Sequence, residues 1–165
     1  ETTEEASALM TGFMEDRPML QSRLLAAVAI AREQPEVDTE NLAAMGYCFG
    51  GLCVLDLARI NAPLAGVVSF HGLLVGPGNT AGTRISPRVL AEHGWDDPMV
   101  PPEQVLAFTE EMTAAGADWQ LHGHGGTVHA FTNPQANDPD FGTVYNEAAQ
   151  RRSWQSLENF LAELF

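Results

Sequence analysis

One cysteine stands in a setting that suits a nucleophile. Cys48 lies within residues 45–51 (Met-Gly-Tyr-Cys-Phe-Gly-Gly), after one apolar run and before another that has helical character. A strand that turns into a helix within so few residues forces its apex into a cramped backbone conformation, and small neighbours such as Gly46 and Gly50 tolerate it best. The first N–H groups of the helix would lie beside the sulfur and stabilise a thiolate and a nearby oxyanion. The segment therefore predicts a nucleophile elbow with cysteine at its apex.

A cysteine nucleophile needs a base for its proton and an acid that fixes the tautomer of that base. Asp97 follows the third predicted strand and His129 lies in the loop after the fourth, so the chain order is nucleophile, acid, histidine. That is the order found in α/β-hydrolases. Asp96 competes for the role of the acid, but Asp97 is preferred because Pro98 holds its turn extended. We expect Cys48, Asp97 and His129 to be catalytic.

The other histidines and the second cysteine have simpler interpretations. His71 and His93 each precede a glycine at a strand end, and both are expected to line the cleft without reacting. His122 and His124 are spaced as metal ligands on one strand could be, but the sequence suggests no third ligand, so no metal is predicted. Cys53 lies one turn into the helix and is expected to be a small core residue.

Composition narrows the class of protein. The chain has 165 residues, which suits one domain, and a formal net charge of −14 in which every basic residue is arginine. Such a charge repels phosphate backbones and anionic lipids, so neither nucleic acid nor membrane is an expected partner. The two cysteines lie too close along the chain for a sensible disulfide, which favours a reducing, cytoplasmic location. Both a monomer and a homodimer remain open.

Four apolar runs are predicted as strands, and they alternate with predicted helices. The strands fall at residues 42–45, 64–70, 88–92 and 119–124, and the helices at 16–35, 51–58, 102–116 and around residues 154–164. Residues 1–15 are compatible with a frayed helix or a solvated segment, and residues 73–83 and 125–144 are predicted as loops. This alternation predicts an α/β fold with a mostly parallel sheet and helices on both faces. In such sheets reactive groups gather beyond the carboxyl ends of the strands.

The chain resembles the dienelactone hydrolase family of α/β-hydrolases in three segments: residues 46–51 (GYCFGG), 93–98 (HGWDDP) and 126–131 (GTVHAF). The likeness continues through Tyr145-Asn146 and Arg152-Ser153-Trp154. It implies a Cys48–His129–Asp97 triad that hydrolyses a small ester or lactone through an acyl-enzyme, with no metal and no organic cofactor. The backbone N–H of Phe49 is expected to stabilise the oxyanion, and Tyr47 and Phe131 to contribute to binding.

The chain departs from the family pattern in two ways. The family has further strands before the helix at Arg17, which supply a second oxyanion donor and a glutamate near the resting cysteine, so residues 1–165 are expected to form the C-terminal two-thirds of one domain. The elbow strand would then be an open edge. Relatives that act on dienelactone carry an arginine where this chain has Asn133. A broader carboxylesterase or thioesterase, and a non-catalytic ligand binder or thiol sensor, are therefore the alternatives.

Overall fold

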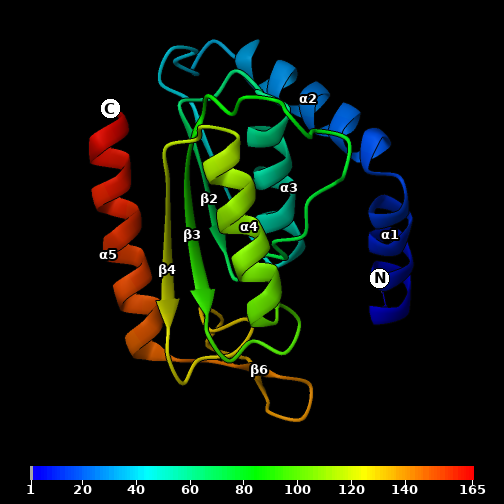
Figure 1. Cartoon of the computed structure of the whole chain (residues 1–165), viewed down its shortest axis with the longest axis vertical. Helices are drawn as coiled ribbons and strands as arrows, with labels where there is room; N and C mark the ends of the chain where they lie inside the picture. The colour runs from blue at the N-terminus through cyan, green and yellow to red at the C-terminus, as the bar shows by residue number, and fades with distance from the viewer. Residues whose placement is uncertain (1) are drawn as a thin grey trace.

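The computed structural model describes residues 2–165, and its centre is a four-stranded parallel sheet (Figure 1). The strands are β1 (Ala43–Tyr47), β2 (Gly66–Phe70), β3 (Arg88–Gly94) and β4 (Trp119–His124), and they lie in that order across the sheet. Each coincides with a predicted strand to within a few residues, and the predicted α/β fold with a parallel sheet is confirmed. The elbow strand β1 lies at one edge of the sheet, where Met45 and Tyr47 are exposed.

The helices are α1 (Thr3–Glu15), α2 (Arg17–Arg32), α3 (Phe49–Arg59), α4 (Pro102–Ala114) and α5 (Glu147–Leu164). Residues 1–15 were compatible with either a frayed helix or a solvated segment, and α1 shows that most of them are helical. Residue 1 lies outside the described residues. Short polar side chains begin three of these helices, because they accept hydrogen bonds from N–H groups that the first turn leaves unpaired. Thr2 caps α1, Asp16 caps α2 and Asn146 caps α5.

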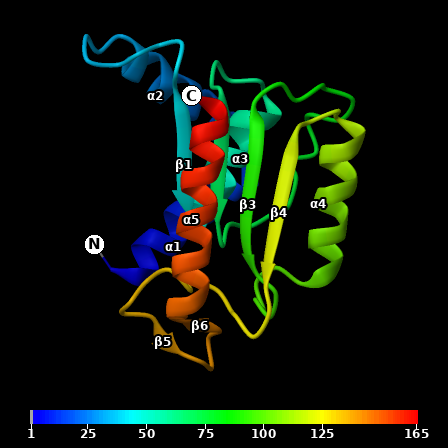
Figure 2. The same ribbon diagram turned by 90° about the vertical axis from the view of Figure 1, so that its left-hand side faces the viewer.

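Helices cover both faces of the sheet (Figure 2). One face packs against α3 and α4, and the other packs against α5. Alternation along β2 explains how one strand serves both layers, since successive side chains point to opposite faces. Val67 is buried under α3 and α4, whereas Val68 is buried with Phe160 of α5. No helix among residues 2–165 is both long enough and apolar enough to span a membrane.

A buried group of charges joins α2, α3 and α4. The carboxylate of Asp56 is fully buried and accepts hydrogen bonds from Arg17, at 2.9 Å to Nε, and from Arg59, at 3.3 Å to Nη1. Arg59 also donates two hydrogen bonds to Glu111 of α4, at 2.9 and 2.7 Å. Buried charges are tolerated when they are paired in this way, so the group fixes how the three helices meet.

Candidate active site

Cys48 lies at the sharp corner between β1 and α3. Its backbone has φ 52° and ψ −121°, a conformation that few residues other than glycine adopt, and its N–H donates to the carbonyl of Phe70 at 3.1 Å. Gly46 is required for space, because a Cβ there would collide with the carbonyl group of Gly50. The strained corner points the sulfur away from the sheet and places it at the N-terminus of α3, as the sequence pattern predicts.

Asp97 and His129 form a buried hydrogen-bonded pair. The Nδ1 atom of His129 lies 2.7 Å from Oδ2 of Asp97, and both side chains are almost completely buried. The second carboxylate oxygen of Asp97 accepts the backbone N–H of Met99 at 2.8 Å. Asp96, the competing acid, is exposed and accepts the N–H of Gly126 instead. Asp97 therefore holds His129 in the tautomer that leaves Nε2 available.

The loop that carries His129 is more ordered than its sequence suggests. Within it, β5 (Asn137–Asp138) and β6 (Thr143–Val144) form a short antiparallel pair. The backbone of His129 donates to Gly142, in the turn between the two strands, at 3.0 Å, and accepts from Val144 of β6 at 3.2 Å. These contacts set the height of the imidazole above the sheet, so the predicted loop acts as a frame for the histidine.

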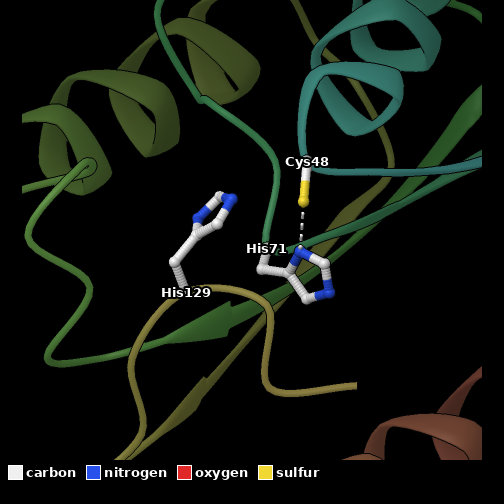
Figure 3. Close-up of side chains that lie close together, drawn as sticks. All are labelled: Cys48, His71 and His129. Atoms are coloured by element: carbon white, nitrogen blue, oxygen red, sulfur yellow. Dashed lines mark hydrogen bonds between the residues drawn. The ribbon is translucent and has the colours of Figure 1, made fainter. Parts of the chain in front are cut away.

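The histidine that the sulfur contacts is His71 rather than His129 (Figure 3). Sγ of Cys48 lies 3.4 Å from Nδ1 of His71, at the end of β2, and Nε2 of His71 lies 2.8 Å from the hydroxyl of Thr132. The ligand atoms of Cys48, His71 and His129 all lie within 4.8 Å of one another. The sequence predicts His71 only as a lining residue. Its orientation depends on a positive φ of 38°, which no residue pattern reveals.

The surroundings shift the pKa values of His71 and His129 in opposite directions. Burial, helped by the positive charge of His129, lowers the pKa of His71 to about 4. Burial by itself also lowers the pKa of His129, but hydrogen bonding to Asp97 and the nearness of Cys48 outweigh it and raise that pKa to about 9. At neutral pH His71 is therefore neutral and His129 is an imidazolium, which can pair with a thiolate.

A cavity of about 420 Å³ opens beside the sulfur. Within residues 2–165 its walls contain apolar and neutral polar side chains without any carboxylate, arginine or lysine, namely Tyr47, Cys48, Phe70, His71, Ala130, Thr132, Asn133, Pro134, Gln150, Ser153 and Trp154. Several come from α5 and the loop after β4, so elements distant in sequence complete the site. A neutral, partly aromatic molecule fits these walls better than an anion.

Tyr47, Phe49 and Phe131, which the sequence assigned to the oxyanion site and to substrate binding, lie in three different settings. Tyr47 lines the cavity and stacks on Phe70, with ring centroids 4.9 Å apart. The backbone of Phe49 begins α3, where the first N–H groups of a helix have no partner within that helix. Phe131 is fully buried and packs edge-on against His71, so it supports that ring from behind rather than facing the cavity.

The second cysteine and the three other histidines lie outside the cavity lining. Cys53 is a partly buried residue of α3, and burial raises the pKa of its thiol to about 11. His93 is buried, and neither of its ring nitrogens has a hydrogen-bond partner among the described residues. His122 and His124 both contact the buried carboxylate of Glu92, at 2.9 and 2.8 Å. That carboxylate gives both histidines a shared hydrogen-bond partner.

Comparison with known proteins places this site in a family. A protein of Caenorhabditis elegans is 38% identical over 149 residues, which cover 88% of this chain and 94% of that protein. A Salmonella typhimurium protein named as a carboxymethylenebutenolidase is 27% identical over 135 residues, or 76% of this chain. The chain spans only 47% of the length of that bacterial relative.

Among solved structures, a dienelactone hydrolase-like promiscuous phosphotriesterase from metagenomic libraries is 40% identical, with a TM-score of 0.90. The match covers 99% of this chain and 69% of that one. The model of the dienelactone hydrolase family matches residues 1–165. The chain therefore belongs to the dienelactone hydrolase family.

Proposed function

We propose that this chain carries the catalytic centre of a hydrolase that cleaves activated esters or lactones through Cys48, His129 and Asp97. The observation that carries the proposal is the Asp97–His129 hydrogen bond of 2.7 Å beside a sulfur at a strand-to-helix corner. A nucleophile, a base and a group that orients the base are the parts that acyl transfer requires. Membership of the family supports the same reaction class.

The proposed reaction has two halves. The Cys48 thiolate attacks the carbonyl carbon, and the N–H of Phe49 donates a hydrogen bond to the oxyanion that forms. His129, as imidazolium, gives its proton to the leaving oxygen, so that a thioester and an alcohol result. Neutral His129 then takes a proton from water, the hydroxide attacks the thioester, and the thiolate leaves with the acid as product.

His71 holds the sulfur in the resting arrangement. Because its neutral ring has one N–H, it donates Nδ1–H to a thiolate while Nε2 accepts the hydroxyl proton of Thr132. The sulfur contacts His71 rather than His129 in the structure, so attack on a substrate moves Sγ from one ring toward the other. The short distances within the cluster, all within 4.8 Å, keep that movement small.

The cavity and the nucleophile together indicate the substrate class. A thiolate leaves a tetrahedral intermediate more easily than an alkoxide, so substrates with poor leaving groups, such as amides, mostly revert. Enol esters, lactones, aryl esters and thioesters go forward. The cavity offers no guanidinium for a substrate carboxylate, since Asn133 stands where dienelactone-cleaving relatives carry arginine. A neutral ester of one aromatic ring is the best match.

Hydrolysis of p-nitrophenyl acetate by the full-length protein tests the nucleophile. We expect Cys48→Ala to abolish turnover and Cys53→Ala, the matched control on α3, to retain it. Activity that survives in Cys48→Ala would contradict the assignment. Comparing lactones, aryl esters and acyl thioesters then separates a lactonase from a broader esterase or thioesterase, and no turnover of any of them would favour a ligand binder or thiol sensor.

A neutral cavity wall also favours a second substrate class, the phosphotriesters. The relative that is 40% identical is named a promiscuous phosphotriesterase. A phosphotriester is uncharged, so it enters a cavity without charged lining as readily as an aryl ester does. Its attack by Cys48 would form an S–P bond and expel the aryl oxide. Release of p-nitrophenolate from a diethyl aryl phosphotriester, absent in Cys48→Ala, is the expected result.

A further inference from the structure

Three ligand atoms of the kind that bind soft divalent cations converge at the site. The sulfur of Cys48 and one ring nitrogen each of His71 and His129 lie within 4.8 Å of one another (Figure 3). The distance between Sγ and Nδ1 of His71 is 3.4 Å. A tetrahedral Zn²⁺ with ordinary bond lengths needs an S···N separation of about 3.5 Å, and the observed separation is close to that value.

Both histidines are oriented as metal ligands usually are. Asp97 accepts a hydrogen bond from Nδ1 of His129, which leaves Nε2 for a cation. The Thr132 hydroxyl lies beside Nε2 of His71, so it can accept the ring proton there when Nδ1 binds a cation. Metal-binding histidines commonly have such a partner on the other ring nitrogen, because it fixes the ring and its tautomer. Thiolate and imidazole together select Zn²⁺ and similar cations over Mg²⁺ or Ca²⁺.

A cation can also reach this position. Cys48 and His71 line the open cavity, which supplies an entry path and room for water as a fourth ligand. The chain has a net charge of −14, which raises the local concentration of cations. The nearest positive charge in the cluster is that of His129 itself, and it disappears when this ring gives up its proton to bind a metal.

We propose that the site binds one Zn²⁺, or a cation of similar softness, through Cys48 Sγ, His71 Nδ1 and His129 Nε2, and that this binding reversibly inhibits the hydrolase. Three bonds to the metal form: Cys48 binds as its thiolate, the Nε2 proton of His129 leaves to solvent, and the His71 proton moves from Nδ1 to Nε2, where the Thr132 hydroxyl accepts it. The nucleophile and its base are then both occupied, so acyl transfer stops. The inhibition rests on the function proposed above, but the binding does not.

Cobalt substitution tests the binding without any assay of activity. The reduced full-length chain is titrated with Co²⁺, whose bond to a thiolate gives a sulfur-to-metal charge-transfer band, and Zn²⁺ is then added as a competitor. We expect one Co²⁺ per chain and loss of the band when Zn²⁺ displaces it. No band in the wild type, or a band that persists in Cys48→Ser, would overturn the site.

The role of His71 distinguishes this three-ligand site from a simple cysteine–histidine pair. We expect His71→Gln to weaken Co²⁺ binding by at least about tenfold and Thr132→Val by about tenfold, because the second loses only the partner that orients the ring. The second variant keeps the test open if His71→Gln does not fold. Cys53→Ser and His122→Gln, which alter residues outside the cluster, should bind as the wild type does. Wild-type affinity in both His71→Gln and Thr132→Val would refute the proposal.

Inhibition is measured separately on p-nitrophenyl acetate turnover. Zn²⁺ should inhibit the wild type at the concentrations that displace Co²⁺, and a chelator should restore the rate. Turnover that is insensitive to bound Zn²⁺ would refute the inhibitory role while leaving the hydrolase intact. Metal binding by a chain that hydrolyses none of the test substrates would support the site and refute the proposed function instead.

Discussion

Cys48 lies near two imidazoles, and the fold keeps one of them neutral and the other protonated. His71 is kept neutral by burial and by the charge of its neighbour, and His129 is kept protonated chiefly by the carboxylate of Asp97. Only one positive charge is then available to the sulfur at neutral pH, and it belongs to the ring that Asp97 orients. This division assigns His129 to proton transfer and His71 to holding the sulfur.

The pKa of His129 gives a testable alkaline limit. Because this pKa is raised to about 9, the imidazolium that protonates the leaving group persists below that pH and is lost above it. In Asp97→Asn the contributions of the carboxylate are lost and those of Cys48 remain, so the limit should move down from about pH 9 toward the ordinary value of 6.5. The rate of acylation at pH 7.5 should fall by about 10²–10⁴-fold.

The pH profile of kcat/KM for phenyl acetate, whose phenolate leaving group is basic enough to need that proton, checks this expectation when it is measured for both proteins. Asp96→Asn is the matched control, because Asp96 bonds a backbone N–H of the loop and does not contact His129. An unchanged alkaline limit in Asp97→Asn would show that the carboxylate does not govern the imidazole.

Residue types and chain order were enough to predict which acid and which histidine meet. Asp97 and His129 are 32 residues apart and pair at 2.7 Å, as expected for groups beyond the ends of neighbouring parallel strands. The contact of His71 with the sulfur could not be predicted in this way. It depends on a single left-handed backbone angle and on Thr132, 61 residues further along the chain.

Among the secondary-structure elements, those with a periodic apolar pattern could be predicted from the sequence, whereas the structure within the loops could not. The strands and the helices α2, α3 and α4 have a repeating apolar pattern, and the sequence predicts them to within a few residues, whereas α5 begins seven residues before the predicted segment. The pair β5 and β6 has two residues in each strand, too few for any period, and it is bonded to the backbone of His129 through Gly142 and Val144. Such a frame exists only once the domain has folded.

Alanine substitutions at Gly46 and Gly50, the glycines on either side of Cys48, test how tightly the elbow is packed. A Cβ at Gly46 would collide with backbone atoms that cannot move, whereas a Cβ at Gly50 meets nothing within 4 Å. The sequence pattern treats the two glycines alike, but only Gly46 is needed for space. Gly46→Ala should cost at least about 3 kcal/mol of unfolding free energy. Gly50→Ala should add about 0.5–1 kcal/mol, because alanine is the better helix former.

Thermal unfolding of the two variants measures this difference. For a domain of this size 1 kcal/mol corresponds to about 2–4 °C in Tm. The Tm should therefore fall by at least about 6 °C in Gly46→Ala and rise by about 1–4 °C in Gly50→Ala. Equal effects of the two substitutions would mean that the corner is not as tight as its geometry indicates.

At the scale of the whole molecule, the buried charges around Asp56 tie the elbow helix to its neighbours. Arg17 is 39 residues from Asp56 in sequence, and Glu111 is 52 residues from Arg59. No local pattern links groups so far apart, so this cluster could not be predicted from the sequence. It matters to the site because α3, which carries Cys48 at its N-terminus, is held through it to both α2 and α4.

Removing the central carboxylate should therefore destabilise the molecule far more than breaking a surface pair. Asp56→Ala leaves the buried guanidinium of Arg17 without its carboxylate partner and removes one from Arg59, which should cost about 3–5 kcal/mol. Asp118→Ala removes the partner of Arg88 in a pair that is 42% and 65% exposed, so it should cost less than about 1 kcal/mol. Urea unfolding of the three proteins gives both values. If Asp56→Ala were no more harmful than Asp118→Ala, the helices would be held by their apolar contacts alone.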